Sequence, residues 1–251
     1  MSNPLPPALA AGLLALAPLS ACEATDAGAL GTILNRTAGA GGAPADAAAL
    51  SQADIEAGLR EALTVGTRRV ANDLGRTDGF LGDPRIRIVL PGRLGEMQRV
   101  VAGTPLAQPF DDLEVRLNRA AERAVPDARD LIVEAVARIT LRDALDILNG
   151  PSDAATRYLQ RETENALRSA FAPAMNAALD ASGAFVSLET VAARNGLGGL
   201  TDRLRQDLVD TAVSEGLDGM FLYLAEEEAR IRANPAARTS ELLRRVFGER
   251  G

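Results

Sequence analysis

Residues 51–74 read SQADIEAGLREALTVGTRRVANDL, and this stretch decides the fold class. Ser51 and Asp54 form a capping-box pattern, the typical start of a helix. The apolar residues that follow recur every three or four positions and share one helical face: Ile55, Leu59, Ala62, Leu63, Gly66, Val70 and Leu74. The stretch therefore predicts an amphipathic helix with one buried face.

The same spacing continues along the chain to its end. It predicts helices over 93–102, from Asp111 to Ala124, from Pro126 to Ile139, over 140–149, over 152–182 with a kink at Pro173, over 208–224 and after Thr239. Glycines and prolines interrupt the pattern near 79–91, where Arg85-Ile86-Arg87-Ile88 alternates, so we expect an extended loop or a short hairpin there. The prediction is an all-α multi-helix bundle of about seven to nine helices in a single helical domain, residues 51–251.

The composition excludes several chemistries. The chain has 251 residues with no His, one Cys and 27 basic residues, all of them Arg. Without His or Lys there is no Ser-His-Asp or Cys-His catalysis, no imidazole metal site, no Schiff base and no P-loop lysine. The net charge of −7 argues against nucleic-acid binding. We therefore predict no metal, no cofactor and no identifiable catalytic residue.

The N-terminal segment has the features of an export signal. Residues 1–21 carry no ionisable side chain and include an apolar run of about a dozen residues, too short to cross a bilayer. Leu19-Ser20-Ala21-Cys22 follows, and it is similar to the lipobox of bacterial lipoproteins, in which the Cys is acylated. We expect residues 1–21 to be a lipoprotein signal peptide and Cys22 the lipid attachment point. The alternative is an ordinary secretory signal that leaves Cys22 as a free thiol.

Residues 22–50 are rich in Ala and Gly, which predicts a flexible tether between the anchor and the helical domain. These features predict a periplasmic protein, such as a palmitate-bearing lipoprotein, held on a membrane by its N-terminal lipid. The residue after Cys22 is Glu23, not Asp, and by resemblance to other lipoproteins this favours the outer membrane.

Several motifs, in order, carry a resemblance to a known family: Gly79-Phe80-Leu81, Leu117 to Glu122, Asp143 to Pro151, Leu217 to Phe221 and Ala225 to Glu228. Together they resemble the bacterial envelope family called domain of unknown function 4197, over roughly residues 54–248. The resemblance implies a helical exported protein, often a lipoprotein, and it implies no activity and no cofactor.

Two groups of residues are candidate sites. Asn118, Arg119 and Glu122 lie on neighbouring positions of one predicted helix and form a polar cluster, either facing a groove or fixing the packing between helices. The second group lies in a turn whose free amides could receive an anion or a carboxylate, and which is otherwise ordinary helix punctuation with Ser152 as the cap: Asn149, Gly150, Asp153, Thr156 and Arg157.

Glu226, Glu227 and Glu228 suggest a metal site, but consecutive helical residues point in different directions, so we interpret them as a solvated face. The function predicted best is a non-enzymatic binding module that takes an envelope protein, a wall component or an apolar ligand. The alternatives are a carboxylate-dependent hydrolase acting on envelope components and a carrier with a large apolar cavity.

Overall fold

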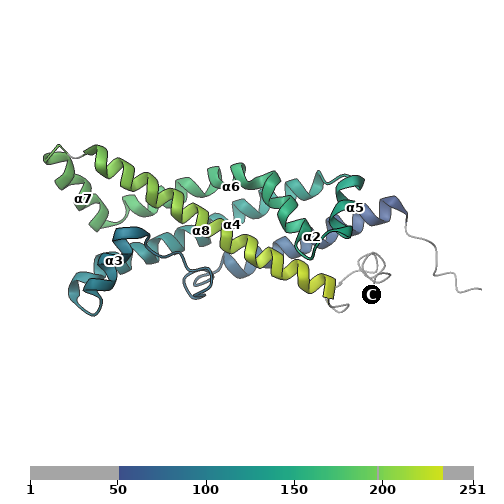
Figure 1. The fold of residues 1–251 in the computed structure, drawn as a ribbon, viewed down its shortest axis with the longest axis horizontal. Coiled ribbons are helices and arrows are strands. Elements are labelled where there is room, and N and C mark those ends of the chain that lie inside the picture. The colour runs from purple at the N-terminus through teal and green to yellow at the C-terminus, as the bar shows by residue number, and fades with distance from the viewer. Residues whose placement is uncertain (1–50, 197, 234–251) are drawn as a thin grey trace, which may run out of the picture. The chain divides into compact units, whose positions relative to one another are not determined.

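The computed structural model describes residues 51–196 and 198–233, and within them the chain is helical (Figure 1). In chain order the elements are α2 (Gln52–Leu74), α3 (Gly92–Val101), the short 3₁₀ turn η1 (Pro105–Ala107), α4 (Gln108–Ala137), α5 (Leu141–Asn149), α6 (Ala154–Asp180), α7 (Gly183–Arg194) and α8 (Gly198–Ala233). These seven α-helices confirm the all-α bundle. The signal peptide, Cys22, the tether and the helix expected after Thr239 lie outside the described residues.

Two helix starts follow directly from the sequence. Ser51 accepts a hydrogen bond from the Asp54 amide, and the Asp54 carboxylate accepts one from the Ser51 amide, which completes the capping box of α2. Thr140 and Asp143 make the same reciprocal pair at the start of α5. Each box satisfies amides that the first turn of a helix leaves without partners.

The prediction that a helix begins at Pro126 is wrong, because α4 runs without interruption from Gln108 to Ala137. A proline inside a helix costs about 3 kcal/mol through its missing N–H and its clash with the preceding turn. Pro126 is exposed, however, so the affected turn faces water, while Val125 and Ala128 beside it are fully buried. Pro173 is likewise exposed and does not divide α6.

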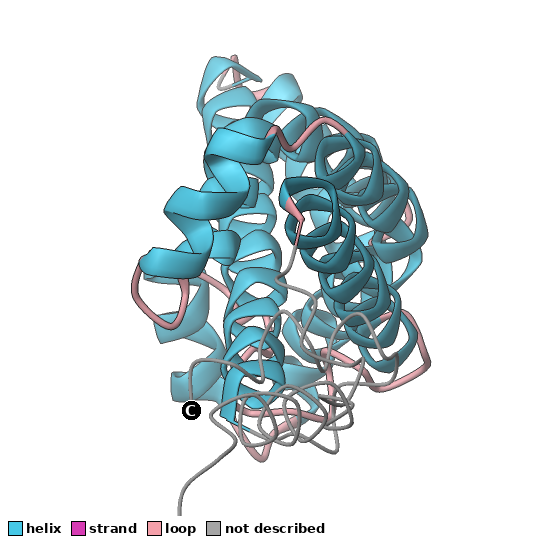
Figure 2. Cartoon of the chain, turned by 90° about the vertical axis from the view of Figure 1, so that its right-hand side faces the viewer, coloured by secondary structure: helices cyan, strands magenta, loops and turns pink. Residues whose placement is uncertain are grey.

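The core lies where the long helices cross. α4 packs along α6, and α8 packs against both α6 and α2, crossing them in Figure 1. Leu117 and Ile132 of α4 and Leu167 and Phe171 of α6 belong to this core and are fully buried. α3 and α7 lie towards one end of this bundle and α5 towards the other (Figure 1), and Figure 2 looks along it from the α5 end.

Candidate functional site

Residues 75–91 form a loop, and no strand is present there or elsewhere in the described ranges, so the hairpin alternative is wrong. The loop is packed like a core element: the side chains of Phe80, Ile86, Ile88 and Leu90 are all buried. Such burial also takes backbone amides and carbonyls away from water, and each then needs a hydrogen-bond partner within the protein.

Asn118 of α4 provides two of those partners. Its Oδ1 accepts a hydrogen bond from the Ile88 amide at 2.9 Å, and its Nδ2 donates to the Ile88 carbonyl at 2.8 Å. Nδ2 also donates to the carbonyl of Glu114 at 2.9 Å. One fully buried side-chain amide thus replaces the neighbouring strand that this extended stretch lacks.

Glu122, one turn further along α4, binds the beginning of the loop. Its Oε1 accepts hydrogen bonds from the amides of Phe80 and Leu81 at 3.2 and 3.3 Å. Arg119 donates to Glu122 Oε2 at 2.8 Å and to Asp78 at 2.7 Å. The structure therefore brings the predicted polar cluster together as a device that holds a loop. Arg119 also lines a surface hollow of about 300 Å³, so the groove alternative stays a prediction.

Helix α8 covers the loop from the other side, and two glycines permit the close approach. A Cβ added at Gly219 would lie 2.9 Å from the Cβ of Ile86, which is closer than such atoms pack. A Cβ at Gly216 would lie 3.3 Å from the ring of Phe171 in α6. Because these two positions of α8 have no side chain, the loop and the ring of Phe171 can pack directly against the helix backbone.

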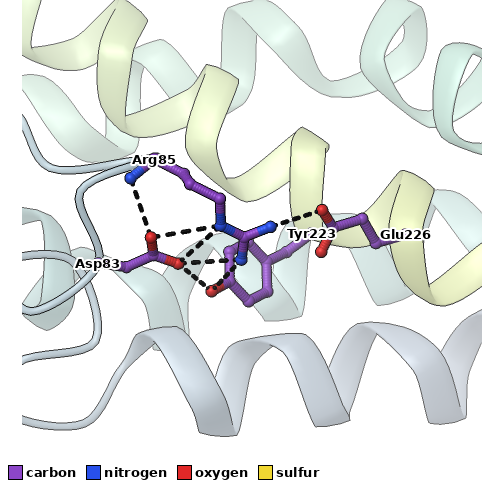
Figure 3. Close-up of polar contacts among 4 residues, drawn as sticks. All are labelled: Asp83, Arg85, Tyr223 and Glu226. Atoms are coloured by element: carbon purple, nitrogen blue, oxygen red, sulfur yellow. Dashed lines mark hydrogen bonds and ion pairs between the residues drawn. The ribbon is translucent and has the colours of Figure 1, made fainter.

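A second group of polar side chains, which we call the Arg85 cluster, lies at the exposed edge of the contact between the loop and α8 (Figure 3). Arg85 donates to Asp83 at 3.0 Å, to the hydroxyl of Tyr223 at 2.8 Å and to Glu226 at 2.7 Å. The Tyr223 hydroxyl donates to Asp83. These hydrogen bonds from Arg85 and Tyr223 lower the pKa of the Asp83 carboxyl to about 2. The cluster joins the loop to α8 with a carboxylate that stays ionised at neutral pH.

Where the loop ends at Pro91, an apolar groove of about 620 Å³ opens between α3, the start of α4, α7 and the first part of α8. Its apolar lining comes from all four helices: Pro91, Leu94, Met97, Pro109, Phe110, Leu113, Phe185, Leu188, Leu200, Leu204 and Leu208. We refer to this feature as the apolar groove.

Arg205 fixes the wall that α7 and α8 form. It donates to Glu189 of α7 at 2.8 Å and to Asp180 at the end of α6 at 2.9 Å. Its guanidinium also lies 5.1 Å from the centre of the Phe185 ring. Phe185 thereby stays pressed against α8, and the groove is held open by packed helices, not by a loop.

Three polar residues border the groove: Arg93, Asp207 and Thr211. Within the described ranges the Arg93 guanidinium makes no hydrogen bond or ion pair, and it is exposed. The groove therefore combines a large apolar surface with a few polar groups at its border, as small-molecule sites commonly do.

The family model described as Protein of unknown function (DUF4197) matches residues 49–248. The chain belongs to this family. No curated protein and no solved structure matches it significantly. In this DUF4197 chain the motifs around Gly79, Asn118 and Met220 meet in space, since the loop packs between α4 and α8.

The second predicted site of the DUF4197 chain, the turn at 149–157, already holds a carboxylate from α8. Glu228 accepts hydrogen bonds from the amides of Ala155 and Thr156 at 3.0 and 2.9 Å and from the Thr156 hydroxyl at 2.9 Å. Arg232 donates to the same carboxylate at 2.8 Å. The amides at the start of α6 do receive an anion, and that anion is internal.

The predicted cap of α6 is wrong. Ser152 does not cap the helix, because the N-cap residue of α6 is Asp153. The side chain of Asp153 makes no capping hydrogen bond. Asp153 instead pairs with Arg157 at 2.8 Å on the surface. Glu228 performs the capping from 72 residues away in the sequence, so local sequence signals could not reveal it.

The solvated-face interpretation is wrong for two of the three consecutive glutamates. Glu227 and Glu228 are both buried. Glu227 binds Arg69 of α2 at 2.6 Å and Arg230 at 2.5 Å, while burial raises its pKa. Glu226 is half exposed and belongs to the Arg85 cluster. Within the described residues, no group of three Asp, Glu or Cys side chains is placed to hold a metal ion.

Glu215 is another carboxylate with a shifted pKa. Glu215 of α8 accepts a hydrogen bond from the Val89 amide at 3.1 Å, and burial together with the nearby Asp218 and Glu114 raises its pKa. Glu215 and Asp218 line a hollow of about 270 Å³ that they share with Arg85 and Arg87.

The apolar groove is the feature that sequence reasoning missed. Leu200, Leu204 and Leu208 recur at four-residue spacing ahead of the predicted helix at 208–224, and this spacing could have extended that helix and marked the groove wall. The other wall comes from α3, which is far away in the sequence, so only the fold could show that the two face each other.

Proposed function

We propose that this chain is an exported, lipid-anchored binding protein whose helical domain takes the apolar chain of a lipid-like ligand into the apolar groove. The observation that carries the proposal is the groove itself: about 620 Å³, with an apolar lining drawn from four helices. This volume lies within the range of known small-molecule sites, roughly 300–1,000 Å³. No helix among the described residues is long and apolar enough to cross a membrane.

The N-terminal sequence supports the anchor and the location. The apolar run followed by Leu19-Ser20-Ala21-Cys22 predicts acylation of Cys22, and acyl chains hold a protein on a membrane without spanning it. The outer membrane facing the periplasm is the proposed location. Globomycin, which blocks lipoprotein signal cleavage, should make the larger precursor accumulate, and an unchanged product size would contradict the anchor.

Binding can be measured with cis-parinaric acid, a fatty acid that fluoresces when its chain enters an apolar site. The full chain should increase the fluorescence in a saturable manner. Leu204→Glu places a charge in the groove and should abolish the increase. Leu222→Glu is the matched control, because Leu222 lies on the same helix, is 40% exposed and does not line the groove.

Equal binding by the two variants would show that the groove is not the site. Native mass spectrometry of the purified chain provides an independent test, since it detects lipid carried through purification. A chain that takes up no probe and no lipid but enriches an envelope protein in a pull-down would favour the partner-protein alternative.

A second candidate, a carboxylate-dependent hydrolase acting on envelope components, has one supporting observation. Glu215 has a raised pKa and lines the same hollow as Asp218, and two carboxyl groups at one hollow are the side chains that such enzymes use. Glycan or ester hydrolysis that disappears in both Glu215→Gln and Asp218→Asn would support it. No turnover by the unsubstituted chain on envelope glycans or ester substrates would exclude it.

A further inference from the structure

Large apolar side chains are exposed in the apolar groove and on the elements next to it. Met97 and Val100 of α3 are 53% and 84% exposed, Leu106 of η1 is 69% exposed, and Leu188 of α7 and Leu200 of α8 are 42% and 64% exposed. We call these five residues the apolar collar. Met97, Leu188 and Leu200 also line the groove, so the collar and the groove form one continuous apolar surface.

We propose that the apolar collar is a membrane-contact surface, through which the groove takes its ligand directly from the lipid bilayer. Exposed apolar side chains gathered in one place mark a site of contact with another surface, whereas scattered ones need no explanation. Here three of the five line the groove for which a lipid-like ligand is proposed, and the other two lie on α3 and on η1, which directly precedes α4. In this respect the inference rests on the proposed function.

The length of chain outside the described residues allows this contact. Residues 23–50 are 28 residues between Cys22 and Ser51, and fully extended they span at most about 100 Å. Ser51 lies 11 residues, about 16 Å along the helix, before Ala62 of α2, which packs beside Ile231 near the end of α8, and from Ile231 to Leu200 is a further rise of about 46 Å along α8. A lipid on Cys22 and the collar can therefore reach the same bilayer surface.

The charges near the collar do not select anionic lipids. Helix α3 carries Arg93 and Arg99 together with Glu96, and α8 carries Asp202, Arg203 and Asp207 close to Leu200. With charges of both signs on each side, apolar burial provides the affinity, as it does for side chains that lie in the interfacial region of a bilayer. We therefore expect the contact to depend little on salt.

The absence of Trp from the chain makes a direct test available. Val100→Trp and Leu106→Trp each place one tryptophan in the collar without lining the groove, and Leu222→Trp places one at an exposed leucine elsewhere on α8. Each full-length variant is reconstituted into vesicles of phosphatidylethanolamine and phosphatidylglycerol, with or without phospholipid brominated in the acyl chain. Bromine quenches only a tryptophan that lies among the acyl chains.

The expected result is a blue-shifted emission and loss of most of the fluorescence on brominated vesicles for the two collar variants, with little change for Leu222→Trp. Replacing Leu106 by Glu, at a collar position that does not line the groove, in the Val100→Trp variant should return its quenching to the level of the control. Uptake of cis-parinaric acid added from solution should persist in that variant, which separates failure of the collar from failure of the groove.

Two results would overturn the inference. Equal quenching of all three tryptophans would show that the anchor alone brings the domain to the lipid, with no preferred face. A blue shift that needs no vesicles and grows with protein concentration would show that the collar is covered by protein, either a partner or a second copy of the chain.

Discussion

Replacing Glu228 by Gln tests whether the start of α6 depends on a carboxylate from α8. The two side chains have almost the same shape, so the change removes a charge and one acceptor without creating a cavity. In the structure the Glu228 carboxylate accepts hydrogen bonds from two backbone amides, one hydroxyl and the Arg232 guanidinium. An amide side chain offers one oxygen, and its NH₂ group must then face a donor of Ala155 or Thr156.

The magnitude follows from two losses. An unsatisfied buried donor costs about 1–3 kcal/mol. Removing an anion from a partly buried helix N-terminus costs about 0.5–2 kcal/mol. We therefore expect Glu228→Gln to lower the free energy of unfolding by about 3 kcal/mol, which for a domain of this size lowers Tm by about 6–12 °C.

The assay is urea unfolding at pH 7, followed by far-ultraviolet circular dichroism. Glu226→Gln is the control, because Glu226 neighbours Glu228 in the sequence, is half exposed and makes a surface ion pair worth at most about 1 kcal/mol. If the two variants differ by less than about 0.5 kcal/mol, given the usual error of such measurements, the carboxylate does not cap α6 in solution. Adding Thr156→Val should show that the two changes are not additive.

Gly219→Ala should destabilise the domain by about 1–3 kcal/mol, because the new methyl group overlaps Ile86. Gly199→Ala is the control and should be neutral or slightly stabilising, because nothing lies near the new methyl group. Thermal melts that rank the two variants in the opposite order would contradict the close packing of the loop on α8. The pKa of Asp83 is lowered to about 2, so its contribution to stability should be complete above the unfolded pKa of about 3.9 and be lost as the pH falls through about 2. In acid titrations of the folded chain, Asp83→Asn should remove that part of the unfolding transition, and an unchanged profile would contradict the Arg85 cluster. In a series of saturated fatty acids competing with cis-parinaric acid, each methylene removed should weaken binding about fourfold while the chain is enclosed, and affinity independent of chain length would contradict an apolar site.

The helices and their capping boxes could be predicted from the sequence because they depend on neighbouring residues. The stripe after Ser51 and the box at Thr140 are local patterns, and both appear as expected. Pro126 misled the prediction, since its cost depends on whether the affected turn faces water, and sequence does not state which face is buried.

The candidate site depended on contacts between distant residues, which no local pattern contains. Asn118 and Glu122 could be identified as a polar cluster on one helical face, but their partners, the amides of Ile88 and Phe80, lie 30 and 42 residues away. The same limit applies to Glu228, whose burial against α6 is set by the crossing of two long helices. The apolar groove is even harder to predict from the sequence, because it exists only where four helices meet.

The packing of the loop against α8 affects the order in which the domain folds. Val89 binds Glu215 across 126 residues, and Arg69 binds Glu227 across 158. Contacts of this sequence separation form late, because a long stretch of chain must be closed before they stabilise anything. A nascent chain that has not yet produced α8 would leave the buried side chains of the loop without their cover. The last described helix thus sets the moment at which the domain becomes protease-resistant, and a chain stopped before Gly216 should remain degradable.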